Sequence, residues 1–399
     1  MNDKVKKSFA GKAKAMIGDL FGRRSAAEAA KWKDRAKAIF PWAVVGLLDR
    51  NVQRGVLTFD GNVHGEGFYA GEYEVVMQSL PKMKWVTKAV SGGLDYSFMW
   101  GSKGVAANVR AGTLAAKKDA VLVVCEDGFL RSADTWANLS APDRYRHGCS
   151  VVFDTLGHYF DATRPSSVEM MLNDSALTIT DEQCTEARRV MERIVSTKLT
   201  KYNHQPIFVP QVGRPGRRKV LVVDQSYGDM AIAKGWGSDQ TFADMLEDAK
   251  RENPDADILV KTHPDTMTGK RGGYYTDVKE EGSVFRVTMP VNPYSLMEIV
   301  DKVYVCSTQM GFEALMAGKE VHVYGMPFYA GWGLTIDKQK NPRRTNRRTL
   351  EEVFYIFYIM YTHWVDIETG RPCTIDKAID NLLALREEYV RVGGVPDER

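Results

Sequence analysis

The stretch KVYVCSTQMGFEALMAGKEVHVYG, residues 302–325, has the pattern of two short apolar strands on either side of a helix. Residues 302–306 and 320–324 are strand-like, because β-branched and aromatic residues dominate them. The segment between them starts with Ser307 and Thr308, which are residue types that favour helix starts. Short, wholly apolar strands that alternate with helices are typical of a parallel sheet covered on both faces. The stretch therefore predicts one unit of a Rossmann-like domain.

The same alternation surrounds this unit. The other strands and helices expected nearby are KVLVVD (219–224), SDQTFADMLEDAKREN (238–253), DILVKTH (257–263), VFRVT (284–288) and PYSLMEIV (293–300). Residues 61–204 show the alternation less regularly, with YSFMW (96–100) and AVLVVCE (120–126) as the clearest strands. The sequence thus predicts an α/β fold of two Rossmann-like domains, whose parallel sheets face each other across a cleft.

The segment NHQPIFVPQVGRPGRRK, residues 203–219, is rich in proline and glycine and reads as the linker between the two domains. Before it, residues 180–202 are expected to form a long helix, with Thr180 and Gln183 as a capping box. A further helix is expected over residues 349–365. The predicted parts are a basic N-terminal extension (1–60), an N-terminal Rossmann-like domain (61–204), a C-terminal Rossmann-like domain (205–370) and a C-terminal helix (371–399).

Charge is spread unevenly along the chain. The net charge of the 399 residues is only +3, which gives no global nucleic-acid signature, so no nucleic-acid partner is expected. Residues 1–55, however, hold 13 Lys and Arg against 5 Asp and Glu. Two interpretations of this basic arm stay open: an amphipathic segment in peripheral contact with an anionic membrane, and a solvated tail.

The five cysteines suggest a reduced compartment. Their number is odd and they contain no C-x-x-C pair, so a cytoplasmic location fits them best. No cluster of Cys and His has the spacing of a metal site, and no P-loop or G-x-G-x-x-G motif occurs. We therefore expect no metal and no cofactor.

Polar side chains follow four of the expected strands. The residues concerned are Glu126 and Asp127, Asp224 with Asp229 shortly after it, His263 and Pro264, and Ser307, Thr308 and Gln309 ahead of Gly311 and Glu313. Any one of these groups would be explained by turn or helix capping. Ligands of parallel sheets bind beyond the carboxyl ends of the strands, so the four groups together predict a ligand site.

These residue types suggest separate roles. Hydroxyl groups and free N–H groups at Ser307 and Thr308 suit a phosphate, and His263 suits a hydrogen bond to a phosphate oxygen. Glu313 is expected either to bind a ribose diol or only to favour the helix start. Arg131 suits a sugar carboxylate or a phosphate, because a guanidinium group binds either one bidentately.

The loop GMPFYAGWGLT, residues 325–335, places Tyr329 and Trp332 among glycines. Two interpretations are equally open. The aromatic rings either stack on a sugar or base of the acceptor, or pack as a plug at one end of the core.

The motifs EDGFLRS, VVDQSYGDM, VKTHPD, CSTQMGFEALMAGK and PFYAGWGLT, in this order, resemble those of KpsC-type capsular polysaccharide β-Kdo glycosyltransferases over residues 95–390. Each motif occurs once here, as in a single module of that family. The resemblance implies a GT-B fold with an acceptor domain followed by a CMP-sugar donor domain. It also implies CMP-β-Kdo as the donor, a retained linkage, and a lipid-linked or Kdo-terminated glycan acceptor at the inner face of the inner membrane of Gram-negative bacteria.

A retaining transfer by double displacement needs two carboxylates in different roles. The resemblance favours an aspartate of DQSYGD, Asp224 or Asp229, as nucleophile and Glu126 as acid/base. Asp224 is slightly preferred, because it ends its strand directly. Two alternatives stay open: transfer of another CMP-sugar such as a sialic acid, and a non-catalytic protein of capsule assembly.

Overall fold

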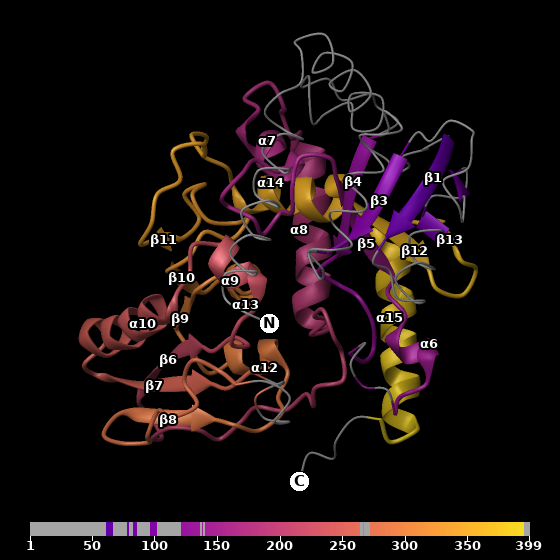
Figure 1. Cartoon of the computed structure of the whole chain (residues 1–399). Coiled ribbons are helices and arrows are strands. Elements are labelled where there is room, and N and C mark those ends of the chain that lie inside the picture. The colour runs from indigo at the N-terminus through magenta and orange to yellow at the C-terminus, as the bar shows by residue number, and fades with distance from the viewer. Residues whose placement is uncertain are drawn as a thin grey trace, which may run out of the picture.

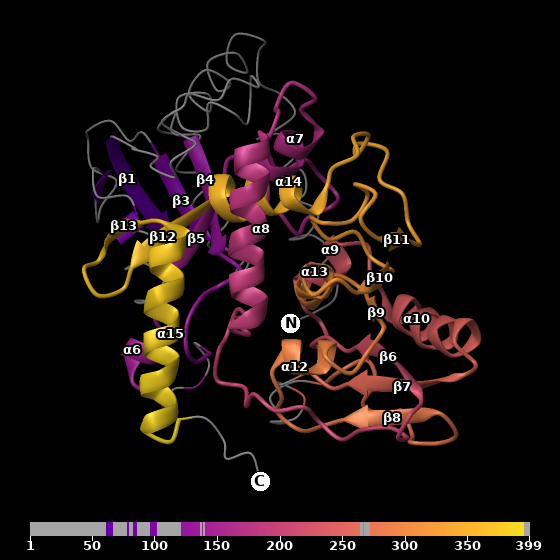
Figure 2. The same cartoon turned by 180° about the vertical axis from the view of Figure 1, so that it is seen from behind.

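The computed structural model describes residues 61–66, 78–79, 83–85, 96–101, 121–135, 138, 140–263, 266 and 272–394. The basic arm of residues 1–55 and Pro264 therefore lie outside the described residues. Figure 1 shows two α/β bodies side by side, and in the view from behind the helix α8 (Asp181–Ser196) again stands between their sheets (Figure 2).

The first sheet has seven strands in the order β13-β12-β5-β4-β3-β1-β2. These strands are β1 (Gly61–Glu66), β2 (Met83–Trp85), β3 (Tyr96–Trp100), β4 (Val121–Asp127), β5 (Ser150–Asp154), β12 (Thr362–Asp366) and β13 (Arg371–Cys373). The strands from β2 to β4 are parallel, whereas β5, β12 and β13 continue the sheet in antiparallel fashion. The parallel half of the sheet thus ends at β4, the strand that carries the acid pair.

The second sheet has six strands, all parallel, in the order β11-β10-β9-β6-β7-β8. These strands are β6 (Arg218–Val223), β7 (Ala256–Lys261), β8 (Val284–Val287), β9 (Lys302–Val305), β10 (Glu320–Val323) and β11 (Ile336–Asp337). The expected α/β fold with two mostly parallel sheets is confirmed. The departure from the expected all-parallel arrangement lies in the antiparallel half of the first sheet.

Helices cover both sheets. They are α6 (Asp143–Arg146), α7 (Ser167–Asn173), α9 (Met230–Lys234), α10 (Asp239–Glu252), α12 (Pro293–Met297), α13 (Met310–Met316), α14 (Leu350–Phe354) and α15 (Ile375–Arg391). The expected capping box at the start of α8 is present: the Thr180 hydroxyl accepts from the Gln183 N–H, and the Gln183 side chain accepts from the Thr180 N–H.

The helix expected over residues 349–365 is wrong in its last four residues. The segment runs as α14, then as a π-helix over Tyr355–Tyr361, and then as strand β12. Residues 362–364 pair with β5 and so satisfy the N–H and C=O groups at the outer edge of that strand. The chain therefore returns to the first sheet at Thr362, although the second domain is expected to extend to residue 370.

The two bodies share one apolar core. Phe129, which follows β4, packs its ring against Phe328 and Phe357 at centroid distances of 5.0 and 4.6 Å, and the rings of Phe328 and Phe357 stack at 4.0 Å. All three side chains are buried. The contact between the bodies is thus a packed interior seam, and burial of large aromatic side chains is among the strongest stabilising contributions available to it.

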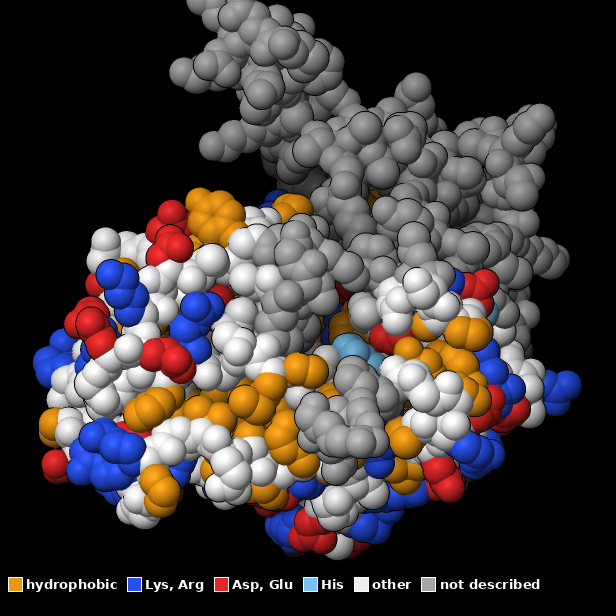
Figure 3. Space-filling view, turned by 90° about the horizontal axis from the view of Figure 1, so that it is seen from below, with side chains coloured by type: hydrophobic (Ala, Val, Ile, Leu, Met, Phe, Trp, Pro, Cys, Tyr) orange, Lys and Arg blue, Asp and Glu red, His pale blue; other side chains and the backbone are white. Residues whose placement is uncertain are grey.

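Seen from below, the described residues place Lys and Arg side chains among Asp and Glu along the sides and the lower edge of the molecule, with hydrophobic side chains exposed between them (Figure 3). Elsewhere in the described residues, Ile207 and Val209 of the linker between α8 and β6 are among the exposed large hydrophobic residues.

Candidate active site

Glu126 and Asp127 end β4 side by side, but the structure separates their roles. Asp127 is 7% exposed, and its Oδ1 accepts a 2.7 Å bond from Nε of Arg131. Glu126 is half-buried, and its Oε1 accepts from the Asp127 N–H at 3.0 Å. Gly128 follows because a Cβ there would collide with the side chain of Ser150 on β5. Asp127 thus anchors the segment, and Glu126 is the more accessible acid.

Arg131 does not lie where a carboxylate or phosphate ligand could use its guanidinium group. It is 3% exposed, and besides Asp127 it donates from Nη1 to Ser132 Oγ at 3.0 Å and to the Arg146 carbonyl at 2.6 Å. A buried guanidinium group needs such acceptors to offset its lost hydration. The predicted ligand role is therefore replaced by a positioning role toward Asp127.

The start of α13 touches the acid segment of the other body. Nε2 of Gln309 donates a 2.8 Å bond to the carbonyl of Phe129, and Ser307 and Thr308 precede it with half-buried side chains. The Ser307 N–H donates to Oε1 of Gln225 at 2.9 Å. The predicted hydroxyl and amide residues therefore lie at the seam, between the end of β4 and the end of β6.

Asp224 is placed as an internal anchor. It is 1% exposed, and its carboxylate accepts backbone N–H bonds from Gln225 (2.9 Å), Tyr274 (2.8 Å) and Tyr275 (3.5 Å). A Cβ at Gly273 would collide with its Oδ2. Burial raises the pKa of Asp224, and the three N–H donors act against that rise. A nucleophile must reach the anomeric carbon, so the preference for Asp224 over Asp229 does not agree with this burial.

Asp229 is exposed and caps α9, with its Oδ1 accepting from the Ala231 N–H at 2.9 Å. The end of α9 contacts the first body: the Ala162 N–H donates to the Lys234 carbonyl at 3.0 Å, and Nζ of Lys234 donates to Oδ2 of Asp161 at 2.7 Å. In both ribbon views α9 lies beside α13, between the two sheets (Figures 1 and 2). Asp229 is therefore an accessible carboxylate on an element of the seam.

His263 follows β7 and is half-buried, with its Nδ1 at 2.9 Å from Oγ of Ser226. Ser226 lies between Asp224 and Asp229, so the histidine joins the same edge of the second sheet. Lys261, the last residue of β7, is 7% exposed. Burial lowers the pKa of Lys261 to about 8, and the charge of Asp224 acts in the opposite direction. Lys261 is absent from the residues expected at this edge, although its place in VKTH could have marked it.

Glu313 is not available to a ribose. It is 3% exposed, accepts from the hydroxyl of Thr200 and from Nε2 of Gln309 at 3.2 Å, and burial raises its pKa to about 7. Both donors are uncharged, so no cation offsets the cost of ionisation among these contacts. Glu313 thus ties α13 to the residues that follow α8.

Tyr329 and Trp332 are fully buried, so the packed alternative describes them and the stacking role does not. The Tyr329 hydroxyl donates to the Thr308 carbonyl at 2.6 Å, and Nε1 of Trp332 donates to the Phe328 carbonyl at 2.7 Å. Gly311 allows this packing, since a Cβ there would collide with the Tyr329 hydroxyl. The aromatic loop therefore supports the start of α13 from beneath.

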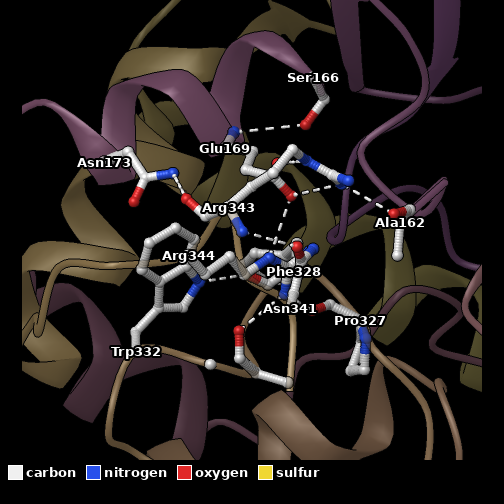
Figure 4. Close-up of polar contacts among 12 residues, drawn as sticks. Ala162, Ser166, Glu169, Asn173, Pro327, Phe328, Trp332, Asn341, Arg343 and Arg344 are labelled. Carbon is white, nitrogen blue, oxygen red and sulfur yellow. Dashed lines mark hydrogen bonds and ion pairs between the residues drawn. The ribbon is translucent and has the colours of Figure 1, made fainter. Parts of the chain in front are cut away.

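A buried ion cluster fixes this loop to the first body (Figure 4). Glu169 on α7 accepts from Nε of Arg343 at 2.6 Å and from Nε of Arg344 at 3.0 Å. Arg344 is buried, donates to the carbonyls of Pro327 and, at 2.7 Å, Ala330, and lies 5.5 Å from the Trp332 ring centroid. The Glu169 carboxylate of the first body thereby fixes the aromatic loop that packs against the start of α13.

Within the described part of the chain, every helix is too short or too polar to span a lipid bilayer. The sequence profile of capsule polysaccharide biosynthesis proteins matches residues 98–214 and 211–367. The chain is also 36% identical over 304 residues to the capsule polysaccharide modification protein LipA of Neisseria meningitidis, a match that covers 74% of this chain and 42% of LipA. The chain thus spans less than half the length of that curated relative.

Two solved structures are similar to this one. The β-Kdo 2,4 transferase of Thermosulfurimonas dismutans KpsC matches at 35% identity and a TM-score of 0.70, over 80% of this chain and 97% of that chain. The β-Kdo 2,7 transferase of the same protein matches at 25% identity and a TM-score of 0.58, over 82% and 99%. The fold is accordingly GT-B-like, and the chain belongs to the family of capsule polysaccharide biosynthesis proteins.

Proposed function

We propose that the chain is a retaining glycosyltransferase that moves β-Kdo from CMP-β-Kdo to a glycan or glycolipid acceptor in capsular polysaccharide biosynthesis. The observation that carries the proposal is the bond from Gln309 to the Phe129 carbonyl, which holds the start of α13 next to the end of β4. The bond supports the proposal because it brings the residues of the proposed phosphate site and an accessible carboxylate to the same seam. The similarity to two Kdo transferases supports Kdo as the proposed sugar.

The proposed donor site lies at the edge of the second sheet. The Thr308 hydroxyl and the His263 imidazole are the proposed donors for the phosphate of CMP, while Ser307, whose N–H and hydroxyl are bonded to Gln225 and Ala231, and Gln309 hold this turn in place. The protein groups proposed for the reaction are side chains alone, so we propose no metal and no cofactor.

The proposed reaction is a double displacement. A carboxylate oxygen of Asp229 bonds to the anomeric carbon of Kdo, and the bond from that carbon to the phosphate oxygen breaks, so CMP leaves with the electron pair. The acceptor hydroxyl oxygen then bonds to the same carbon, its proton moves to Glu126, and the ester bond breaks to restore the carboxylate. Two inversions retain the linkage. The exposure of Asp229 and the burial of Asp224 support this choice of nucleophile.

The decisive experiment is incubation of the full chain with CMP-β-Kdo and a Kdo-terminated acceptor, followed by chromatography for CMP and mass spectrometry of the acceptor. We expect release of CMP together with an acceptor heavier by one Kdo. Incubation with a CMP-sialic acid is the matched arm. Turnover of the sialic acid donor alone would replace the proposed donor, and binding of CMP without turnover of either donor would favour a non-catalytic role in capsule assembly.

The proposed partners at the membrane are tested separately. We propose that residues 1–55 make peripheral contact with anionic lipid, on the ground of their charge. Deletion of this arm should abolish co-sedimentation with anionic vesicles at low salt and leave turnover of a short acceptor unchanged. Failure of the full chain to bind such vesicles would show that the arm is only solvated.

A further inference from the structure

The turn that follows α8 carries Lys201 back toward the end of β4. Lys198 has a left-handed backbone, with φ of 55°, where glycine is the usual residue. Its N–H donates to the Val195 carbonyl at 3.1 Å, and the N–H of the fully buried Leu199 donates to the Ile194 carbonyl at 3.0 Å. These two bonds form a Schellman turn, which reverses the chain at the end of the helix.

The reversed segment is fixed on both sides of the seam. The Lys201 carbonyl accepts from the N–H groups of Arg131 at 3.1 Å and Ser132 at 3.2 Å. The neighbouring Thr200 donates its hydroxyl to Glu313 on α13. The main chain at Lys201 is therefore held between the residues that follow β4 and the helix α13 of the second body.

The Lys201 side chain points to the acid pair. Its Nζ lies 3.7 Å from Oδ2 of Asp127 and 5.7 Å from the centroid of the Tyr202 ring, and the side chain is 27% exposed. Burial acts to lower the pKa of Lys201, but Tyr202, Asp127, Tyr159 and Glu126 outweigh it, so the pKa lies above its ordinary value. The ammonium group is therefore charged at neutral pH.

This cation has donors left for a ligand. The distance of 3.7 Å to Asp127 is too long for a hydrogen bond, and within the described part of the chain Nζ makes none. Asp127 already receives the short bond from Arg131. Three ammonium donors, partly open to solvent and close to Asp127, thus remain at the seam.

We propose that Lys201 binds the carboxylate of the acidic sugar that occupies this site, and so selects acidic over neutral sugars. The inference rests on the proposed function and extends it. Kdo carries a carboxylate on its anomeric carbon, and the two acids at the end of β4 repel that group. Lys201 offsets the repulsion and adds a charge-assisted hydrogen bond, whereas a neutral sugar gains neither. The ligand role predicted for Arg131 thereby falls to a lysine from another element.

The test compares Lys201→Met and Lys201→Arg with Lys250→Met, a control on α10 whose lysine pairs with Glu247 at the surface. KM for CMP-β-Kdo and the calorimetric Kd for CMP are measured for each protein, with circular dichroism as the check on folding. Loss of one charge-assisted bond is expected to raise KM about 10- to 100-fold in Lys201→Met, with the Kd for CMP unchanged. Lys201→Arg should keep most of the affinity, and Lys250→Met should behave as the wild type.

Three outcomes would overturn the inference. An equal loss of CMP and CMP-β-Kdo affinity would place Lys201 at the nucleotide. An unchanged KM with a shifted pH profile would mean that the lysine only neutralises Glu126 and Asp127. A KM for Lys201→Arg as high as that of Lys201→Met would show that the positive charge is not what the sugar requires.

If the wild type itself releases no CMP from CMP-β-Kdo, the proposed function fails first, and the inference fails with it. Should Lys201→Met not fold, Lys201→Gln takes its place in the same comparison.

Discussion

The amide of Gln309 donates a 2.8 Å hydrogen bond to the carbonyl of Phe129, and so joins the start of α13 to the residues that follow the acid pair of β4. The same amide donates to Glu313, whose other donor is the hydroxyl of Thr200. One short network thus spans both bodies, from the residues that follow β4 to α13 and the residues that follow α8. The positions of the candidate site residues therefore depend on the contact between the two bodies as well as on the two sheets.

Variants of the two carboxylates in the proposed double displacement should give different results in a labelling experiment. With CMP-β-Kdo, Glu126→Gln should accumulate a covalent Kdo adduct, because the first step needs no base and the second does. Asp229→Asn should form no adduct, because an amide cannot replace the nucleophile. Intact-protein mass spectrometry and peptide mapping report both results.

The control for this experiment is Asp255→Asn, at an exposed position outside the seam, which should behave as the wild type. Asp224→Asn should instead lower stability, since it disturbs the carboxylate that accepts the N–H groups of Gln225 and Tyr274. An adduct mapped outside residues 224–229 would contradict the assignment of the nucleophile. A full set of variants without any adduct would favour same-face attack.

His263→Ala should weaken CMP binding and turnover together. Its imidazole is proposed to donate to the phosphate, and a lost charge-assisted hydrogen bond costs on the order of 1.5–3 kcal/mol, or about 10- to 100-fold in Kd. Ser226→Ala should have a smaller effect, since it removes only the partner at 2.9 Å from Nδ1. Isothermal titration with CMP measures both, and an unchanged Kd in His263→Ala would remove the histidine from the donor site.

Glu313 should make stability depend on pH. Burial raises its pKa from 4.5 to about 7, so the folded chain holds this proton more tightly than the unfolded chain. The contribution to the free energy of unfolding is then complete below about pH 4.5 and is lost as the pH rises through about 7. At about 1.36 kcal/mol per pH unit, the loss has an upper bound of about 3 kcal/mol.

Glu313→Gln cannot ionise and should escape that loss. The difference in unfolding free energy between Glu313→Gln and the wild type should therefore rise from pH 4.5 to pH 8, as measured by urea unfolding at several pH values. Glu387→Gln, at an exposed side chain of α15, serves as the control and should give a flat difference. A flat difference in Glu313→Gln as well would show that Glu313 titrates normally.

Removal of Glu169 should destabilise the chain strongly. The variant Glu169→Ala leaves the buried Arg344 without its carboxylate, and breaking a buried ion pair on one side costs about 3–5 kcal/mol. The carbonyls of Pro327 and Ala330 still accept from Arg344, which favours the lower end of that range. Urea unfolding gives the value. As the control, Glu247→Ala breaks only the surface pair with Lys250 and should cost less than about 1 kcal/mol. An equally small loss of stability in Glu169→Ala would show that the buried ion cluster does not hold the aromatic loop.

Local patterns were readable from the sequence because their causes lie within a few residues. The alternation of apolar strands and helices after the linker predicted β6, β7, β8, β9 and β10, and the pair Thr180 and Gln183 predicted the cap of α8. The carboxyl ends of parallel strands share one edge, so the placement of Ser307 and His263 near the end of β6 also followed from the fold class. The sheet that receives Thr362–Asp366 did not follow, because an apolar run carries no record of its partner strand.

The α/β class, the family resemblance and the residues at the strand ends could be predicted from the sequence, because these depend on local order along the chain. Which of these side chains are buried or paired inside the protein depends on the folded structure. Arg131 donates to Asp127, Glu313 accepts from Thr200, and Trp332 is buried in the core. In each case the position of the partner depends on the whole fold. Burial and charge pairing are set by distance in space, and for that reason the place of Lys201 beside Asp127, to which the turn after α8 carries it, could be found only in the folded structure.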